Sequence, residues 1–332
     1  MGSSDASATC LRAILREETL EVAGVVTQPD RPAGRGRALT PCPCRAFAAA
    51  HGIRETIAPQ DVNSPAALER IAAWRPDAIA VVAFGQFLKA PLLALPRFGC
   101  LNCHFSLLPK YRGASPVAAA IAAGDRMTGV TVMRMGPGMD DGPVLLQSYE
   151  PIYSDATGGE LMEGLAVAGG VALAKVLRLA AAGMLPREVP QNAAEATYAG
   201  KLKKSDGLVR WASPALAIER MVRAYDPWPG CHAFLPERFR KRGGSGRVTI
   251  LKAELWPEMD PGWRDAAPGT VLKCVMSRQK GSATQATGPV IKCGDTALLL
   301  AALKPEGGSA MDGKSFLMGR RLEVGADRLL EA

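Results

Sequence analysis

The sequence has few aromatic residues, few histidines and no long uninterrupted apolar run. Aromatic side chains account for 5% of its 332 residues, and there are three histidines. No apolar run approaches the roughly 20 residues that a membrane-spanning helix needs. The start carries no basic segment followed by an apolar stretch, which is the pattern of a signal peptide. We therefore expect a cytoplasmic protein with no membrane partner.

Eight cysteines are present, but their spacing does not form the framework of a small disulfide-stabilised scaffold. A chain of this length can build a hydrophobic core without cross-links. Cys100 and Cys103 match the C-x-x-C pattern of metal and redox sites, but a strand would direct them to opposite faces. The histidines also lack zinc-motif spacing. We therefore predict reduced thiols and no protein-bound metal.

The composition is that of a folded globular chain, because 48% of residues are apolar and 22% are charged. The net charge of +8 is unevenly distributed. Residues 1–190 carry 18 basic and 17 acidic side chains, whereas residues 191–332 carry 22 and 15. Such asymmetry favours contact between the second half and a polyanion. A basic surface that only maintains solubility is the alternative.

The first half of the sequence alternates short apolar segments with amphipathic ones. Strands are expected at 20–26, 78–83, 99–104, 129–135 and 144–149, and helices at 8–16, 43–51, 64–74, 115–123 and 157–182. This alternation predicts an α/β domain over residues 1–183, Rossmann-like, with a mainly parallel sheet. No strand precedes the first helix, although the first strand of such a sheet is usually central. Either this sequence begins late or the first strand is absent.

The pattern changes after residue 183. Residues 184–199 contain two prolines and few periodic apolar positions, which is typical of a linker. Residues 200–332 contain one clear helix, at 213–224, and short strands at 248–255, 270–274, 290–293 and 297–303. This region is therefore predicted to form a small β-barrel domain of the OB-like kind.

The densest polar cluster lies at the end of a predicted strand. Asn102 and His104 are two residues apart and should project from the same face. Open α/β sheets bind their ligands at the carboxyl ends of their strands. An amide can stabilise an oxyanion and an imidazole can move a proton, which suits acyl transfer. Asp140, in a loop between two later strands, can orient such an imidazole. A histidine that only satisfies its own hydrogen bonds, and an acidic pair in a turn, remain the alternatives.

Two basic clusters can meet phosphate groups. Arg35 and Arg37 lie on a glycine-rich segment, and their forked guanidinium groups suit phosphate oxygens. Lys201, Lys203 and Lys204 follow the linker and would add attraction that does not depend on base sequence. A solvated basic loop is the alternative for the arginines.

Several segments resemble the methionyl-tRNA formyltransferase family, and the resemblance extends along nearly the whole sequence. The matching segments are residues 26–36, 102–109, 111–113, 138–142, 197–204 and 227–230. Residues 26–36 resemble the family's inserted loop near the tRNA acceptor arm, and residues 102–109 match its formyl-folate signature. The Asn-x-His-x-Ser-Leu-Leu-Pro core is also found in glycinamide ribonucleotide and sugar-nucleotide formyltransferases. It therefore indicates folate chemistry, whereas the arginine loop and the basic C-terminal region favour a tRNA acceptor.

The resemblance implies transfer of the formyl group of 10-formyltetrahydrofolate to the α-amino group of methionyl initiator tRNA, by a monomer. Asn102 and His104 would stabilise the tetrahedral oxyanion, and Asp140 would assist proton transfer from the amine. The folate would lie against a wall formed by Ser106, Leu107, Leu108 and Pro109. The tRNA phosphates would be bound by Arg35, Arg37, Lys201, Lys203 and Lys204.

The sequence departs from the family pattern at two positions beside these residues. Phe105 stands where a small residue is usual and is expected to alter the folate pocket. Asp141 stands where threonine is common, so Asp140 is the better match to the catalytic aspartate.

Three other functions remain open from the sequence. One is a formyltransferase with a small acceptor such as a phosphoribosyl amine. Another is a non-catalytic RNA-binding protein on a decayed formyltransferase scaffold, which the retained Asn102, His104 and Asp140 disfavour. The third is hydrolysis of the formyl-folate with water as acceptor.

Overall fold

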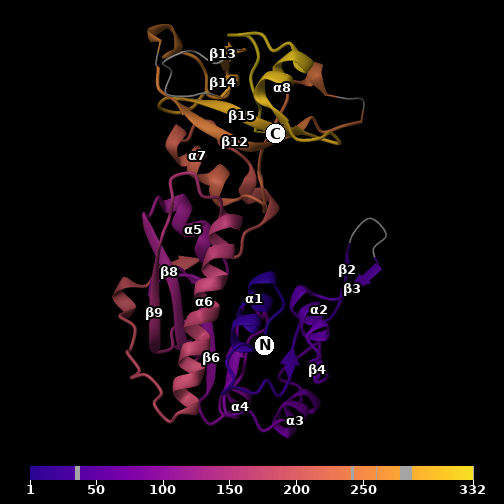
Figure 1. Ribbon diagram of the computed structural model, residues 1–332. Coiled ribbons are helices and arrows are strands. Elements are labelled where there is room, and N and C mark those ends of the chain that lie inside the picture. The colour runs from indigo at the N-terminus through magenta and orange to yellow at the C-terminus, as the bar shows by residue number, and fades with distance from the viewer. Residues whose placement is uncertain (34–37, 241–242, 259, 277–285, 332) are drawn as a thin grey trace. The chain divides into compact units, whose positions relative to one another are not determined.

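The computed structural model describes residues 1–331 apart from 34–37, 241–242, 259 and 277–285 (Figure 1). The chain forms two compact units. Unit 1 comprises Met1–Val117, Arg126–Tyr153 and Glu160–Gly200. Unit 2 comprises Ala118–Asp125, Ser154–Gly159 and Lys201–Ala332. Each unit is described separately below.

Four strands of unit 1 form one sheet in the order β5-β6-β8-β9. Their bounds are β5 (Ile79–Val81), β6 (Cys100–His104), β8 (Met127–Arg134) and β9 (Val144–Pro151). β5 and β6 are parallel, but β6–β8 and β8–β9 are antiparallel. The prediction of an α/β unit is confirmed, whereas a mainly parallel sheet is wrong for this part. A loop without a crossover helix joins β8 to β9, and such a connection gives antiparallel neighbours.

Three further strand pairs complete unit 1. They are the parallel pair β1 (Val25–Val26) and β4 (Thr56–Ile57), the antiparallel pair β2 (Arg31–Ala33) and β3 (Ala38–Thr40), and the parallel pair β7 (Arg112–Gly113) and β10 (Tyr198–Ala199). The strand expected over residues 20–26 is reduced to β1, because residues 20–24 are not paired in a ladder.

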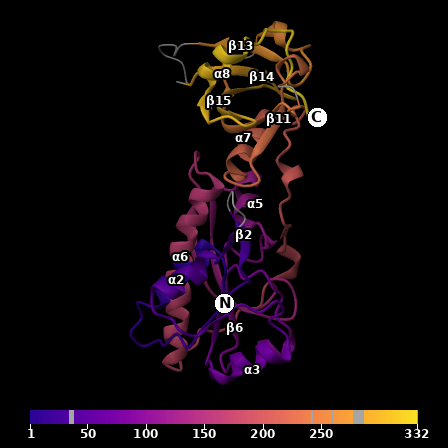
Figure 2. The ribbon, with the colours of Figure 1, turned by 90° about the vertical axis from the view of Figure 1, so that its right-hand side faces the viewer.

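Helices cover both faces of these strands. Their bounds are α1 (Asp5–Ile14), α2 (Pro43–Ala50), α3 (Pro65–Ala73), α4 (Ala90–Leu93) and α6 (Gly158–Ala181), with the 3-10 helix η1 (Ala193–Glu195) in the linker. Most of α5 (Pro116–Ala123) belongs to unit 2. Val25 packs with α1 and α2, whereas Val26 belongs to a second cluster with α3 and α4. Figure 2 shows α2 and α6 on the same side, away from α3. The α1 helix starts earlier than expected because Ser4 caps it.

Helix α6 is long and apolar enough to cross a membrane by length and composition alone, and half of its most apolar window is buried in the protein. Core helices of globular proteins pass the same test. The expectation of no membrane partner therefore stays a prediction.

Unit 2 is built on a six-stranded antiparallel sheet. Five strands follow the order β11-β12-β15-β14-β13, and β16 pairs with β15. The elements are η2 (Lys204–Gly207), α7 (Ala215–Ala224), β11 (Cys231–Phe234), η3 (Glu237–Phe239), β12 (Arg247–Trp256), η4 (Pro261–Trp263), β13 (Val271–Val275), β14 (Gly288–Lys292), β15 (Ala297–Pro305), β16 (Met311–Asp312) and α8 (Gly313–Arg320). Its core includes the fully buried Trp211, Phe316 and Ile291. The four expected strands are confirmed, and β11, β16 and α8 were not expected.

Candidate active site

Strand β6 directs Asn102 and His104 to one face of the sheet. All five residues of β6 are buried, and the strand is held between β5 and β8. Neighbouring side chains of a strand point to opposite faces. Cys103 and Phe105 accordingly pack toward α6, where a Cβ added to Gly169 would lie 2.6 Å from the Cys103 sulfur and 3.3 Å from Phe105 Cε1. Phe105 is thus part of the helix contact on the face opposite Asn102.

The loop between β8 and β9 brings Asp140 to the same face. Asn102 Nδ2 donates to Asp140 Oδ1 at 3.4 Å, and His104 Nδ1 lies 3.7 Å from Asp140 Oδ2. The backbone of Asp140 is in the left-handed region, with φ of +50°. The three residues named from the sequence therefore lie together.

The hydrogen bonds of His104 show which ring nitrogen carries a proton and which one faces Asp140. Nε2 lies 2.9 Å from the carbonyl oxygen of Tyr111, which can only accept, so Nε2 carries a proton. Nδ1 is then the nitrogen that faces Asp140. Asp140 Oδ2 also accepts from the Gly113 amide at 2.8 Å. A proton that arrives at Nδ1 therefore meets a carboxylate already held in position.

The segment 106–109 forms a hydrogen-bonded wall next to β6. The buried Ser106 hydroxyl donates to the Lys110 carbonyl at 2.6 Å. Thr131 Oγ1 accepts from the Leu108 amide at 3.0 Å and donates to the Ser106 carbonyl at 2.6 Å. Leu108 is buried as well, whereas Leu107 and Pro109 are partly exposed. Of these four residues, Leu107 and Pro109 are the ones whose side chains can contact a ligand directly.

Sequence reasoning missed Gln191, which lies in the linker. Its Nε2 donates to the carbonyl oxygens of Asp140 at 2.8 Å and Gly142 at 2.7 Å. Its Oε1 accepts from Arg112 Nε at 3.1 Å and Nη2 at 2.8 Å. Gln191 therefore ties the Asp140 loop to the buried Arg112. Arg112 was within the motif at 111–113, but no local pattern singled out a glutamine in the linker.

The basic residues are placed only in part. Arg35 and Arg37 lie outside the described residues. Lys201, Lys203 and Lys204 are all exposed, at the start of the long segment of unit 2. Their exposure is compatible with phosphate contact, and the contact itself stays a prediction.

Within the described ranges, no group of three or more histidine, cysteine, aspartate or glutamate residues is arranged to hold a metal ion. The Cys100 thiol donates to the Leu92 carbonyl at 3.6 Å, and burial raises the pKa of Cys100 to about 12. A hydrogen bond with Cys10, together with burial, raises the pKa of Cys103. Both groups are thiols at neutral pH, whereas a thiolate is the form that binds metals and attacks disulfides.

Comparison with known proteins identifies the family. Residues 2–177 match the formyl transferase family model, and residues 201–321 match the model of the formyl transferase C-terminal domain. The chain is 40% identical to the methionyl-tRNA formyltransferase of Pseudomonas putida (strain GB-1) over 329 residues, which cover 99% of the chain and 97% of that protein. It is 42% identical to the methionyl-tRNA formyltransferase of Xanthomonas campestris pv. campestris (strain 8004) over 321 residues, or 96% of each.

A solved structure with the same fold is the N-formyltransferase from Helicobacter canadensis, in complex with folinic acid and dTDP-3-aminofucose. It superposes with a TM-score of 0.56 at 14% identity, over 90% of this chain and 96% of that one. At that identity the likeness concerns the fold alone. The two family models and the relatives at about 40% identity nevertheless agree, so the chain belongs to the methionyl-tRNA formyltransferase family of formyl transferases.

Proposed function

We propose that this enzyme transfers the formyl group of 10-formyltetrahydrofolate to the α-amino group of methionyl initiator tRNA, for translation initiation. The observation that supports this most directly is the convergence of Asn102, His104 and Asp140 at the end of β6. Family membership supports methionyl-tRNA as the formyl acceptor, because the relatives at about 40% identity are named methionyl-tRNA formyltransferase.

The reaction needs an oxyanion to be stabilised and a proton to be moved. The amine nitrogen bonds to the formyl carbon, and the tetrahedral intermediate collapses when the bond from that carbon to the folate nitrogen breaks. Asn102 Nδ2 is held by one long hydrogen bond to Asp140 and can turn to the oxyanion. His104 donates from Nδ1 when protonated, since Nε2 is engaged with Tyr111. Asp140 accepts the amine proton, which finally returns to the folate nitrogen.

The folate co-substrate would lie against Leu107 and Pro109, while Ser106 and Leu108 hold the wall from behind. This assignment follows the exposure of the four side chains. The Helicobacter canadensis enzyme was crystallised with a folate, folinic acid. None of the steps proposed here requires a protein-bound metal.

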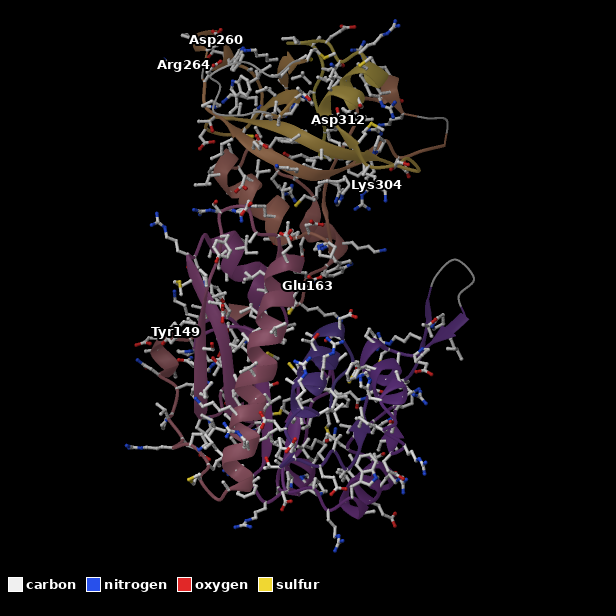
Figure 3. The ribbon with its side chains drawn as sticks, in the orientation of Figure 1. Tyr149, Glu163, Asp260, Arg264, Lys304 and Asp312 are labelled. Atoms are coloured by element: carbon white, nitrogen blue, oxygen red, sulfur yellow. The ribbon has the colours of Figure 1, made fainter. Side chains whose placement is uncertain are left out.

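The tRNA would be bound mainly by the C-terminal part of the chain. We assign residues 1–183 to the catalytic domain, 184–199 to the linker and 200–332 to a tRNA-binding domain. Lys201, Lys203 and Lys204 would contact phosphates, as would Arg35 and Arg37, which lie outside the described residues. Exposed lysines occur elsewhere on unit 2, such as Lys304 on β15 (Figure 3).

An OB-like barrel is our proposal for the C-terminal domain. The residues after α8 support it because they bridge both edges of the sheet: Leu330 pairs with Phe234 at the end of β11, and Arg328 pairs with Thr270 next to β13. We further propose that the enzyme acts as a cytoplasmic monomer.

Formylation assays with two acceptors, and one without an acceptor, test the function. The enzyme is supplied with 10-formyltetrahydrofolate and with methionyl initiator tRNA, a phosphoribosyl amine, or no acceptor. We expect formyl-methionyl-tRNA in the first reaction alone. Turnover with the small acceptor, formate release without acceptor, or tRNA binding without turnover would each replace the proposal with one of the three alternatives.

A further inference from the structure

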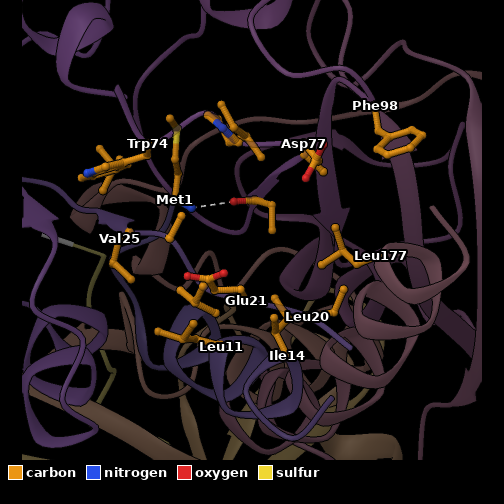
Figure 4. A pocket seen from close by; sticks show the side chains of 18 of the residues that line it. Met1, Leu11, Ile14, Leu20, Glu21, Val25, Trp74, Asp77, Phe98 and Leu177 are labelled. Atoms are coloured by element: carbon orange, nitrogen blue, oxygen red, sulfur yellow. Dashed lines mark hydrogen bonds between the residues drawn. The ribbon is translucent and has the colours of Figure 1, made fainter. Parts of the chain in front are cut away.

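The large cavity of unit 1 is not where the acceptor meets Asp140. The cavity, of about 820 Å³, lies beside β1 and β5 (Figure 4). Among the described residues, Val25 and Trp74 belong to its lining, whereas Asn102, His104 and Asp140 do not. The end of the acceptor is therefore held by another part of the unit.

Tyr198 is an exposed aromatic residue in the linker. The residue is 68% exposed, and within the described part of the chain its side chain makes no hydrogen bond and no ring contact. Single exposed apolar side chains are common on protein surfaces. The position of Tyr198 relative to the site therefore decides whether its exposure has a function.

The backbone on either side of Tyr198 is fixed to the segment that bears the site. β10, which contains Tyr198, pairs in parallel with β7. The Thr197 carbonyl accepts from the Arg112 amide at 2.8 Å, and the Thr197 hydroxyl accepts from the Tyr111 amide at 2.8 Å. The Tyr111 carbonyl is in turn the partner of His104 Nε2. The ring of Tyr198 thus stands on a fixed support, and a tyrosine side chain itself has few free torsions.

The register of the ladder places Tyr198 on the side of the Asp140 loop. Tyr198 pairs with Arg112, and the side chains of paired residues project from the same side of a ladder. Arg112 reaches Gln191, which donates to the Asp140 carbonyl. The Gly113 amide donates to Asp140 Oδ2. Because strands lie about 4.8 Å apart and rise about 3.3 Å per residue, the Cα atoms of Tyr198 and Gly113 are about 6 Å apart.

The other exposed aromatic residues of unit 1 lie on other elements. Tyr149 is on β9, the edge strand that β8 separates from β6, and Tyr153 follows that strand. Phe87 precedes α4. Of the exposed aromatic residues in the described part of unit 1, Tyr198 alone is carried by the segment that bonds to residues 111–113.

The proposed acceptor has a base close to its reacting amine. In an aminoacyl-tRNA, only the α-carbon, the carbonyl carbon and the ester oxygen separate the amine from the terminal ribose, which carries adenine. When the amine reaches Asp140, this adenine lies beside the site. Proteins commonly hold an unpaired base by stacking it on an aromatic side chain, because every base has a π-face.

The folate co-substrate also has aromatic rings, but its proposed position is the wall at residues 106–109. Tyr198 is next to Gly113, whose amide holds the Asp140 carboxylate. Asp140 is the proposed acceptor of the amine proton. The position of Tyr198 therefore favours the base of the acceptor over the rings of the folate.

We propose that the ring of Tyr198 is the platform on which the terminal adenine of the aminoacyl-tRNA stacks, so that it holds the acceptor end beside Asp140. This assignment rests on the proposed function and adds a residue that recognises the acceptor. It also separates a tRNA acceptor from a phosphoribosyl amine, which has no base to stack.

A cycle that removes the ring and the base in turn tests the proposal. One probe is methionine joined through an amide to an amino-substituted adenosine, and the second is the same amide on the sugar without its base. Calorimetry gives the Kd of both probes for the unmodified protein, Tyr198→Ala and Tyr198→Phe. The matched control is Tyr149→Ala, because Tyr149 is 64% exposed in the same unit but lies on β9 (Figure 3).

We expect removal of the base to weaken binding about tenfold in the unmodified protein, in Tyr198→Phe and in Tyr149→Ala, and less than about twofold in Tyr198→Ala. The KM for methionyl initiator tRNA should rise about tenfold in Tyr198→Ala, with kcat and the KM for the folate nearly unchanged, as when only uniform binding is lost.

An equal effect of base removal in all four proteins would overturn the proposal. A rise in the KM for the folate in place of the KM for tRNA would also overturn it, because the ring would then contact the co-substrate. Failure of the proposed function gives a different result: the unmodified protein forms no formyl-methionyl-tRNA, while the binding cycle still shows whether ring and base interact.

Discussion

The strand layer of unit 1 is fully paired on the β6 side of β5 and open on the β1 side. On the β6 side, the polar groups of Asn102, His104 and Asp140 are each engaged by a neighbour. On the β1 side, Ala80 and Val26 face a cavity of about 820 Å³. The chemistry and the incomplete packing thus lie on opposite sides of one short strand.

This contrast indicates that the catalytic geometry is set by β6, the Asp140 loop and the linker rather than by the layer as a whole. Preorganised donors contribute to catalysis because they need no rearrangement during the reaction. The apolar side chains that line the cavity contribute to stability through the apolar surface that they bury. Changes on the β6 side should therefore alter turnover, and changes on the β1 side should alter stability.

The largest effect is expected from the two donors on β6. Asn102→Ala and His104→Ala should each lower kcat about 10²–10³-fold, because each removes a group that stabilises the oxyanion. Single-turnover formylation and tRNA binding are measured in parallel, with circular dichroism as the control for folding. Equal losses of tRNA affinity and turnover would contradict the assignment, because the donors would then act in binding.

The pairing of Asn102 with His104 was predictable because alternation along a strand depends on local sequence alone. Asp140 was identified from its motif, but its position beside His104 depends on a left-handed backbone conformation within the loop. The role of Gln191 was not predictable, since it depends on the linker returning beside β7 through β10. The direction of β8 and β9 was also missed, because apolar runs do not encode whether neighbouring strands are parallel.

The shortening of the strand expected over residues 20–26 has a different cause. Its sequence favours a strand, yet a strand also needs a partner on which to form its ladder. Residues 25 and 26 have β4, whereas residues 20–24 lie beside the cavity. The prediction was therefore wrong for residues 20–24, because local propensity does not say which residues find a partner strand.

The second effect concerns Gln191, which we expect to act as a positioning residue. Gln191→Glu keeps an acceptor for Arg112 but loses the donor to the carbonyls of Asp140 and Gly142. We expect kcat to fall about tenfold with little change in KM for tRNA, as when a misplaced group weakens only the transition state.

The control for Gln191 is the pH profile of kcat. A displaced Asp140 should shift the profile of Gln191→Glu, whereas general loosening of the fold would lower kcat at all pH values equally. Gln191→Met, which retains length without either hydrogen bond, should resemble Gln191→Glu. An unchanged kcat in both variants would show that the linker does not position the Asp140 loop.

A smaller effect is expected from the lysines of unit 2. Lys203→Ala combined with Lys204→Ala should raise KM for tRNA about fivefold and lower the slope of log affinity against log salt by about 1–2. Lys175→Ala is the matched control, because Lys175 is an exposed lysine of α6 in unit 1. Equal salt slopes for both variants would show that Lys203 and Lys204 do not contact phosphates.

The smallest effect comes from the amine on the open side of the layer. Burial lowers the pKa of the Met1 amine in the folded chain below its ordinary value of 8.0. At a pH between the folded pKa and 8.0, the amine is therefore protonated in the unfolded chain and neutral in the folded chain. Folding stability should therefore fall as the pH decreases below 8, and the loss ends once the folded pKa is passed.

Acetylation of the Met1 amine isolates this contribution, because Glu21, Arg75, Asp77 and Arg97 around the cavity stay unchanged. Between pH 8 and pH 7, the Tm of the unmodified chain should decrease by about 2 °C more than that of the acetylated chain. Parallel Tm profiles for the two chains would mean that the Met1 amine is hydrated rather than buried, and the β1 side of the layer would then be less enclosed than the cavity indicates.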